Sequence, residues 1–417
     1  MYDLVIMGAG YVGLPLARRA CAAGLRVAAV DPSERVITGL NAGRSHVQDV
    51  PDEDLPWMRE AGFVASTTPE PLAVADTVVI CVPTGLTGDG LPDLSAVRAA
   101  AATLAGRLRP GTLVVLESTS FPGTTEEVVR PILESGGLIA GVDFALGYSP
   151  ERIDPGNPRY PVDVVPKVVS GVTALCAKRC AAFYEALVDS VVVASGTREA
   201  EMAKLLENAY RHVNIALVNE LAMVCDRLGV DVWEVIRCAA TKPYGFQEFR
   251  PGPGAGGHCI PVDSRYLSHS AATAGLPCTL VEAASLVNDR MPGYVVTRIR
   301  DAIRRAGAAC RGARVLLLGV TYKPDVADLR ESPAVAVVRG LRAAGIDVTY
   351  HDPLIPEFTV DGQRLEPVAD PAAAAACSTV TVLLQDHTWY DLEHLARSAR
   401  VLLDTRGRVG GERVERL

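Results

Sequence analysis

The stretch DLVIMGAGYVGLPLARRA, residues 3–20, decides the fold of the first part of the chain. It has the pattern of a buried strand, a turn with the spacing G-x-G-x-x-G at Gly8, Gly10 and Gly13, and a helix. In that context the glycines permit a tight turn, the approach of a pyrophosphate to the helix N-terminus, and close packing of helix on strand. Asp31 ends the next apolar strand, where a carboxylate accepts hydrogen bonds from an adenosine ribose. This favours NAD over NADP, although Arg35 nearby leaves some tolerance of a 2′-phosphate open.

The composition indicates a globular protein of two or three domains. The 417 residues are 49% hydrophobic and 22% charged. A net charge of −8 without a long basic run argues against nucleic-acid binding, and no uninterrupted apolar run is long enough to predict a membrane span. The start resembles a buried strand rather than a signal peptide, so we expect a cytoplasmic protein with reduced cysteines. Cys176 and Cys180 are expected in a helix core, and no metal site is predicted.

Short apolar runs alternate with Ala-rich helical stretches up to about residue 195, which predicts a parallel sheet with crossover helices. A stretch without Gly or Pro then covers residues 198–228, with Thr197 as a plausible N-cap and Gly229 as the C′ residue. Alternation returns near residue 306, where AAGIDVTYHDP echoes the earlier AAGLRVAAVDP. We therefore predict an α/β fold with two Rossmann-like domains joined by a long central helix. The expected domains are residues 1–195, 196–305 and 306–417.

Two further strands end in hydroxyl residues. ICVPTG covers residues 80–85 and LESTSFPGTT covers residues 116–125. Both would lie at the carboxyl edge of the first sheet, where ligands bind in this fold. We therefore expect Thr84 and Thr119 to contact the nicotinamide or a nearby water.

The segment GPGAGGHCIPVD, residues 252–263, raises the question of catalysis. A thiol in such a loop is a nucleophile, a metal ligand or inert, and the neighbouring patterns favour the nucleophile. Lys204 and Asn208 share one face of the long helix, and Glu151 follows a strand edge. Asp263 follows Cys259 by four residues with a proline between them, so we expect this pair in a loop. Together these groups suit oxidation of an alcohol through a thiohemiacetal and a thioester, which needs an activated cysteine, an oxyanion stabiliser and a carboxylate that directs water.

At this point the chain resembles the nucleotide-sugar (UDP-glucose/GDP-mannose) 6-dehydrogenase family over essentially its whole length. The resemblance rests on GAGYVG, CVPT, ESTSFPGTT, SPER, AKLLENAYRHVNIALVNELA, PGPGAGGHCIPVD and GVTYKPDVADLRESPA. It implies an N-terminal NAD domain, a central helix that forms a homodimer, and a C-terminal UDP-sugar domain. The implied reaction oxidises the sugar C6 alcohol to a carboxylate with two NAD+.

The resemblance also implies roles for individual residues. Cys259 is the nucleophile, Lys204 assisted by Asn208 stabilises the oxyanion, Asp263 serves the water, and Glu151 and Thr119 support proton transfer. Together with the fold pattern it predicts a cofactor-binding set of Gly8, Gly10, Tyr11, Val12, Gly13, Asp31, Arg35, Val82, Pro83, Thr84, Ser118, Thr119 and Arg330. The predicted substrate-binding set is Glu151, Arg152, Lys204, Asn208, Arg211, His212, Arg250, Gly256, Gly257, Tyr322 and Lys323.

Within the family, the segment before Cys259 is most similar to the branch that oxidises UDP-N-acetylglucosamine, because His258 stands where the UDP-glucose branch more often has Ser. Ser264 and Gly85 replace prolines that are usual there, which leaves the exact sugar open. The alternatives are UDP-glucose and UDP-N-acetylmannosamine as substrates. A two-electron dehydrogenase of a small hydroxy acid would need neither the thiol nor a second Rossmann domain. A regulatory NAD-binding protein without turnover would need neither Cys259 nor Lys204.

Overall fold

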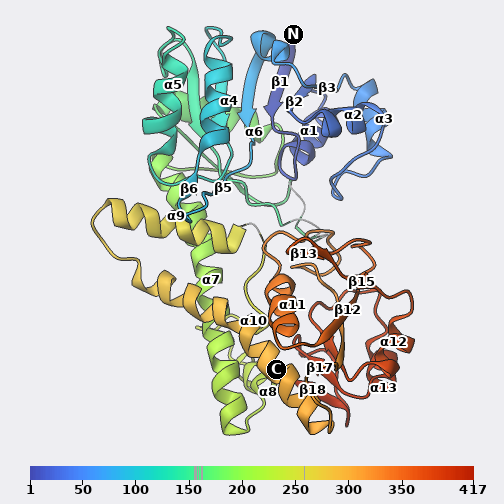
Figure 1. Ribbon diagram of the computed structural model, residues 1–417. Coiled ribbons are helices and arrows are strands. Elements are labelled where there is room, and N and C mark those ends of the chain that lie inside the picture. The colour runs from blue at the N-terminus through green and yellow to red at the C-terminus, as the bar shows by residue number, and fades with distance from the viewer. Residues whose placement is uncertain (155–156, 158, 161–162, 258) are drawn as a thin grey trace. The chain divides into compact units, whose positions relative to one another are not determined.

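The computed structural model describes residues 1–154, 157, 159–160, 163–257 and 259–417, and for Cys259 it describes the place in a helix but not the side chain. The chain divides into two compact units (Figure 1). Unit 1 consists of Met1–Glu207 and Arg265–Leu276, and unit 2 consists of Asn208–Ser264 and Pro277–Leu417. Each unit is described by itself.

Unit 1 contains a sheet with the strand order β10-β9-β8-β7-β4-β1-β2-β3. Its strands are β1 (Tyr2–Met7), β2 (Val27–Val30), β3 (Val64–Ser66), β4 (Ala75–Ile80), β7 (Leu113–Leu116), β8 (Ala145–Tyr148), β9 (Lys167–Gly171) and β10 (Val191–Val193). Strands β8, β7, β4, β1, β2 and β3 are all parallel, in the order of a dinucleotide-binding sheet, and β9 joins β8 antiparallel. The order reverses between β1 and β4, so a ligand crevice is expected where these strands end.

Helices cover both faces of this sheet. They are α1 (Gly13–Ala22), α2 (Glu34–Asn41), α3 (Asp54–Glu60), α4 (Ser95–Ala105), α5 (Arg130–Glu134) and α6 (Ala174–Glu185), with a π-helical segment at Thr124–Val129 and a small hairpin of β5 (Gly85–Leu86) and β6 (Pro92–Asp93). Leu4 and Ile6 share one core with residues of α1 and α6, because alternate residues of a strand face the same side. Cys176 and Cys180 are buried in that core, as predicted.

Unit 2 contains a second parallel sheet in the order β15-β12-β11-β16-β17-β18. The strands are β11 (Arg314–Leu318), β12 (Asp347–His351), β15 (Glu366–Pro367), β16 (Val380–Leu383), β17 (Leu402–Asp404) and β18 (Val414–Arg416), and β13 (Thr359–Val360) and β14 (Gln363–Arg364) form a short hairpin. Val315 and Leu317 pack in one core and Leu316 and Leu318 in another, so both faces of β11 are covered. The first core includes α10 (Thr279–Arg305) and α11 (Pro333–Ala343), and the second includes α12 (Pro371–Cys377) and α13 (Leu392–Ser398).

The long central helix is α7 (Thr197–Leu228), which begins one residue earlier than predicted. Thr197 is the first helical residue rather than the N-cap, and its hydroxyl donates to Glu126 at 2.7 Å. Gly229 has a φ of 67°, which confirms it as the left-handed residue that ends the helix. Helix α8 (Val232–Ala239) follows. The predicted α/β fold with two Rossmann-like parts and a long central helix is confirmed.

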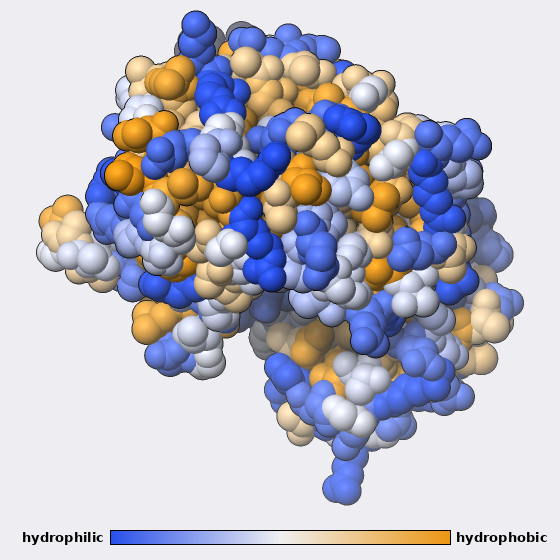
Figure 2. All heavy atoms as spheres, turned by 90° about the horizontal axis from the view of Figure 1, so that it is seen from above, coloured by the Kyte–Doolittle hydropathy of each residue, from blue (hydrophilic) through white to orange (hydrophobic). Residues whose placement is uncertain are grey.

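Charged and apolar residues are interleaved on the face seen in Figure 2, which is the usual character of a protein surface. Among the described helices, none is both long enough and apolar enough to cross a membrane.

Candidate functional site

The turn between β1 and α1 meets the requirements of the glycine fingerprint. Gly8 has a φ of 101°, and a Cβ there would lie 2.7 Å from the carbonyl oxygen of Cys81. A Cβ on Gly13 would lie 1.9 Å from the carbonyl oxygen of Gly8, whereas a Cβ on Gly10 would meet nothing within 4 Å. The first N–H groups of α1 have no side-chain cap. The residues present therefore fit a bound pyrophosphate, because Gly10 adjoins open space at an uncapped helix start.

Asp31 lies directly after β2 and fixes the same turn. Its carboxylate accepts hydrogen bonds from the backbone N–H groups of Ala9 and Ser33, both at 2.9 Å. Each carboxylate oxygen retains a further lone pair, which suits it to accept a hydrogen bond from a ribose hydroxyl. Arg35 is exposed at the start of α2. The sequence-predicted Tyr11 and Val12 are half-buried in the fingerprint turn itself.

The predicted hydroxyl residues follow the ends of the neighbouring strands β4 and β7. Ser118 donates its hydroxyl hydrogen to the carbonyl oxygen of Val82 at 2.7 Å, since β4 and β7 are neighbours in the sheet. Thr84 is buried, Thr119 is half-buried and Pro83 is exposed. Arg330, predicted to meet the cofactor, lies in unit 2, where its guanidinium pairs with Asp328 at 2.6 Å.

A row of charged residues that sequence reasoning missed lies at the edge of unit 1. Glu117 follows β7 and is fully buried, and its carboxylate contacts the ammonium of Lys167, the first residue of β9. That ammonium also lies 3.2 Å from Oε2 of Glu151, which follows β8. Oε1 of Glu151 accepts hydrogen bonds from the backbone N–H groups of Arg152 and Ile153. A lysine at the start of an apolar strand is the sequence signal that could have pointed to this row.

Burial and neighbouring charge act in opposite directions within the row. Burial raises the pKa of Glu151, and hydrogen bonds from Ile153 and the positive charge of Lys204 act against it. Burial lowers the pKa of Lys167 to about 7, while the two carboxylates at its ammonium favour the charged form. Lys204 on α7 is itself buried, with 8% of its surface exposed. The formal charges of the side chains therefore alternate along the row, in the order Glu117, Lys167, Glu151 and Lys204.

Glu201 lies one turn before Lys204 on α7 and contacts the segment after β7. Its side chain is buried and accepts hydrogen bonds from the hydroxyl of Thr125 at 2.7 Å and from the backbone N–H groups of Gly123 and Thr125 at 2.6 and 2.9 Å. Burial raises the pKa of Glu201 to about 7. The segment after β7 is thereby tied to α7 three residues before Lys204. Arg152 is tied to the same helix through Glu207, at 2.8 Å.

The prediction that Cys259 and Asp263 lie in a loop is wrong. Helix α9 (Cys259–Thr273) begins at Cys259, so residues 259 and 263 belong to a helix and not to a loop. Pro261 is compatible because the first N–H groups of a helix have no intrahelical partner. Asp263 is buried, and its carboxylate accepts a hydrogen bond from the buried amide of Asn208 on α7. His258 and the Cys259 side chain lie outside the described part of the chain.

The glycines before Cys259 pack against the segment that follows β11. A Cβ on Gly257 would lie 2.6 Å from the ring of Tyr322, and a Cβ on Gly256 would lie 2.8 Å from the Cβ of Tyr322. Upstream, the N–H of Gly252 donates to the side chain of Asn219 at 3.0 Å. Glycine is therefore needed at both positions so that the backbone can lie directly on Tyr322.

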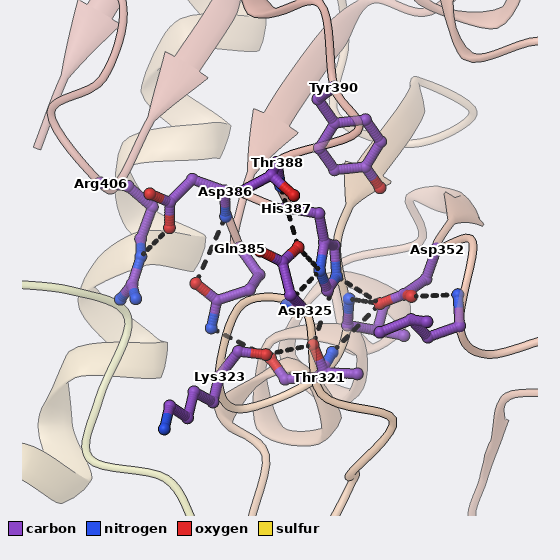
Figure 3. A network of polar contacts seen from close by, with 12 residues as sticks. Thr321, Lys323, Asp325, Asp352, Gln385, Asp386, His387, Thr388, Tyr390 and Arg406 are labelled. Atoms are coloured by element: carbon purple, nitrogen blue, oxygen red, sulfur yellow. Dashed lines mark hydrogen bonds and ion pairs between the residues drawn. The ribbon is translucent and has the colours of Figure 1, made fainter. Parts of the chain in front are cut away.

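The segment with Tyr322 and Lys323 is fixed by a polar network around His387 (Figure 3). The Nδ1 atom of His387 accepts the N–H of Asp325 at 2.9 Å, so the ring proton is on Nε2, which lies 3.1 Å from Asp352. The hydroxyl of Thr321 donates to the carbonyl oxygen of Lys323 at 2.9 Å. Asp325 has a φ of 62°, a strained conformation that these contacts maintain.

The remaining predicted substrate residues have different surroundings. His212 is buried and bonds to Ser285 at 3.0 Å. Arg211 and Arg250 are exposed, and Arg250 pairs with Glu248 at 2.7 Å. Within the described part of the chain, no group of three or more His, Cys, Asp or Glu residues is arranged to hold a metal ion.

Three family models match the chain. They are the UDP-glucose/GDP-mannose dehydrogenase NAD-binding domain over residues 2–188, the central domain over residues 198–290 and the UDP-binding domain over residues 316–410. UDP-N-acetyl-D-glucosamine 6-dehydrogenase of Pseudomonas aeruginosa is 36% identical over 380 residues, which cover 90% of this chain and 89% of that protein. UDP-N-acetyl-D-mannosamine dehydrogenase of Yersinia pestis is 35% identical over 397 residues, which cover 92% and 93%.

The similar solved structures are also nucleotide-sugar dehydrogenases. The UDP-D-ManNAc dehydrogenase of Pyrococcus horikoshii has a TM-score of 0.89 at 31% identity, with 99% of this chain and 98% of that chain covered. A UDP-glucose dehydrogenase of Pyrobaculum islandicum also has a TM-score of 0.89, at 29% identity over 100% and 96% of the two chains. The protein is thus an NAD-dependent nucleotide-sugar dehydrogenase with a UDP-sugar substrate. With all three domains matched in order, the chain belongs to the UDP-glucose/GDP-mannose dehydrogenase family.

Proposed function

We propose that the protein oxidises the C6 alcohol of UDP-N-acetylglucosamine to the uronic acid in a four-electron reaction through a covalent intermediate on Cys259. The observation that carries this proposal is the start of α9: Cys259 opens the helix, Asp263 lies one turn further on, and Asp263 bonds to Asn208 of α7. Lys204 is one turn before Asn208 on the same helix. A helix N-terminus lowers the pKa of a cysteine thiol, which favours the nucleophilic thiolate.

The proposed roles follow from the chemistry of each side chain. Glu151 accepts the proton of the C6 hydroxyl, directly or through a water held by Thr119, as hydride leaves C6 to give an aldehyde. The thiolate of Cys259 adds to the aldehyde carbon, and Lys204 and Asn208 stabilise the oxyanion.

Loss of a second hydride from C6 leaves a thioester on Cys259. Asp263 directs water to the thioester carbon, which releases the uronate and restores the thiol. When bound, NAD+ accepts one hydride in each oxidation, so two NAD+ are consumed per sugar.

We assign cofactor binding to the turn with Gly8, Gly10, Tyr11, Val12 and Gly13, to Asp31 and Arg35, to the strand ends with Val82, Pro83, Thr84, Ser118 and Thr119, and to Arg330. We assign substrate binding to Glu151, Arg152, Lys204, Asn208, Arg211, His212, Arg250, Gly256, Gly257, Tyr322 and Lys323. We also propose that residues 1–195, 196–305 and 306–417 are the NAD-binding, dimerisation and UDP-sugar-binding domains. Asp31 supports a preference for NAD, because its carboxylate would repel a 2′-phosphate.

The stoichiometry of the reaction tests the four-electron proposal. Each UDP-N-acetylglucosamine should yield two NADH and one uronic acid without free aldehyde, as followed by absorbance and mass spectrometry. A ratio of one with accumulation of aldehyde would contradict the covalent route. Relatives named for N-acetylmannosamine and glucose substrates make UDP-N-acetylmannosamine and UDP-glucose the necessary comparisons. A higher kcat/KM for either of them would reassign the sugar and leave the chemistry intact.

The Cys259→Ser variant tests the role of the thiol. A serine hydroxyl without an activating base is a far weaker nucleophile than a thiolate, so acid formation should fall by about a hundredfold or more while NAD+ affinity and thermal stability stay unchanged. Cys238→Ser on α8 is the matched control, since Cys238 is exposed and outside the site. Full activity of Cys259→Ser, or a trapped adduct on another cysteine, would refute the assignment.

A further inference from the structure

Lys167 is a buried cation that the proposed reaction does not use. It begins β9 with 8% of its surface exposed, and its ammonium lies between two carboxylates from neighbouring strand ends. The ring of Tyr184 lies 5.2 Å from the same ammonium. A buried lysine is costly unless its charge is compensated, and here the carboxylates of Glu117 and Glu151 compensate it.

The two carboxylates differ in what else they contact. Glu117 is fully buried, and its Oε2 lies 3.4 Å from the thiol of Cys81. The side chain of Glu151 is 13% exposed. Its Oε1 atom accepts hydrogen bonds from backbone N–H groups, and its Oε2 atom pairs with the ammonium of Lys167. Lys167 is therefore anchored by Glu117 on one side and holds Glu151 on the other.

We propose that Lys167 is a positioning residue that keeps the Glu151 carboxylate ionised and oriented for proton transfer. This inference rests on the role of Glu151 in the proposed function. The cation offsets the burial of Glu151, and the contact at Oε2 together with the backbone contacts at Oε1 restricts rotation of the carboxylate. Glu117 in turn neutralises Lys167, so the row of Glu117, Lys167, Glu151 and Lys204 carries no net charge.

Other titratable groups near Glu151 leave this assignment unchanged. They are Cys81 after β4, Cys180 and Tyr184 on α6, Arg152 beside Glu151, and Lys204 on α7. Burial raises the pKa values of both thiols and of Tyr184, so these three are neutral at physiological pH. The guanidinium of Arg152 is paired with Glu207. The charge of Lys204 also lowers the pKa of Glu151, but the ammonium in contact with the Glu151 carboxylate is that of Lys167, at 3.2 Å.

The test compares Lys167→Met, which removes the charge at similar length, with Lys167→Arg, which retains it. In Lys167→Met the pKa of Glu151 should rise by about one unit or more, because a nearby opposite charge is lost. A 13C titration of side-chain carboxyl groups measures this without turnover, and the Glu151 signal is identified by its loss in Glu151→Gln. The acidic limb of the kcat profile with UDP-N-acetylglucosamine should move upward by the same amount, and Lys167→Arg should restore it.

A double-mutant cycle separates positioning from general structural damage. In the Glu151→Gln background, Lys167→Met should change kcat by less than about twofold. The exposed Lys178→Met on α6 is the control for loss of a lysine elsewhere in unit 1. If Lys167→Met does not fold, Lys167→Gln takes its place, because its amide still donates to the carboxylates but carries no charge.

An unchanged Glu151 titration in the uncharged variant would overturn the inference whatever the activity. An equal loss of kcat in the wild-type and Glu151→Gln backgrounds would overturn it as well. A shifted titration in a protein that oxidises no UDP-sugar would instead support the link between Lys167 and Glu151 and refute the proposed function.

Discussion

At the scale of single residues, the three fingerprint glycines serve two different purposes. Gly8 and Gly13 are required by contacts within the protein, because a Cβ on either would strike backbone atoms. Gly10 adjoins open space, so its small size matters only when a ligand approaches. The same sequence pattern therefore combines a folding requirement with a binding requirement.

This difference predicts opposite outcomes for two alanine variants. Gly13→Ala should lower the free energy of unfolding by about 1–3 kcal/mol or more, because the helix must move away from the strand. Gly10→Ala should keep the melting temperature but weaken NAD+ binding by about tenfold or more, measured by isothermal titration calorimetry. The prediction fails if Gly10→Ala destabilises the fold as much as Gly13→Ala does, or if its NAD+ affinity equals that of the wild type.

At the scale of elements, α7 is joined to the segment after β7 by a group that titrates. The carboxyl of Glu201 accepts three hydrogen bonds from Gly123 and Thr125, yet burial raises its pKa to about 7. Between the unfolded pKa of 4.5 and this value, the folded protein binds more protons than the unfolded chain. Stability contributed by the protonated carboxyl is therefore present at acidic pH and lost as the pH rises towards 7.

The expected change is about 3 kcal/mol between pH 4.5 and pH 7, which corresponds to the difference between the two pKa values. Urea unfolding at half-unit pH steps measures it. In Glu201→Gln, this part of the pH dependence should disappear, while Glu199→Gln, an exposed position on the same helix, should retain it. Identical pH profiles for wild type and Glu201→Gln would show that Glu201 does not titrate in this range.

Most helices and strands could be predicted from the sequence, but some contacts between them could not. Strand and helix alternation, the glycine spacing and the absence of Gly and Pro from residues 198–228 were sufficient for both sheets and the long helix. The helix at Cys259 was missed because Gly-Gly before it and Pro261 within it resemble a loop. Glu117 and Lys167 are 50 residues apart, so only the sheet order that brings β7, β8 and β9 together reveals their contact.

The polar network around His387 was missed for the same reason. Its partners Thr321, Asp325 and Asp352 come from separate segments after β11 and β12. None of them has a local sequence spacing that distinguishes it from an ordinary strand end. The sequence predicts Tyr322 and Lys323 as binding residues, but the groups that hold the backbone at Lys323 in place are visible only in three dimensions (Figure 3).

At the scale of the whole molecule, α7 carries a stripe of exposed apolar side chains. Tyr210, Leu217, Val224 and Leu228 are 46%, 61%, 47% and 70% exposed and follow one another at intervals of seven, seven and four residues. Such spacing places them along one side of the helix, as in a helix that packs against a second copy. We propose that this stripe is the dimer contact.

Leu217→Asp should therefore weaken self-association by placing a charge in the contact. Size-exclusion chromatography with light scattering should show a dimer for the wild type and half that mass for the variant at micromolar concentration. Leu175→Asp on α6 is the matched control, because Leu175 is also 61% exposed but lies outside the stripe. A monomeric wild type, or a variant that remains dimeric, would contradict the assignment.

The contact between Tyr322 and the glycines at 256 and 257 has a consequence for building chimeric enzymes. Exchange of the UDP-binding domain between relatives is one way to build such chimeras, with a crossover placed in the region before β11. In such a chimera, one parent supplies the ring of Tyr322 and the other supplies Gly256 and Gly257. The ring packs directly on the backbone of the two glycines, so a side chain at either position would clash with it. Parents that differ at any of these three positions should yield hybrids whose parts fold but in which Cys259 is misplaced, whereas parents that share them offer a compatible junction.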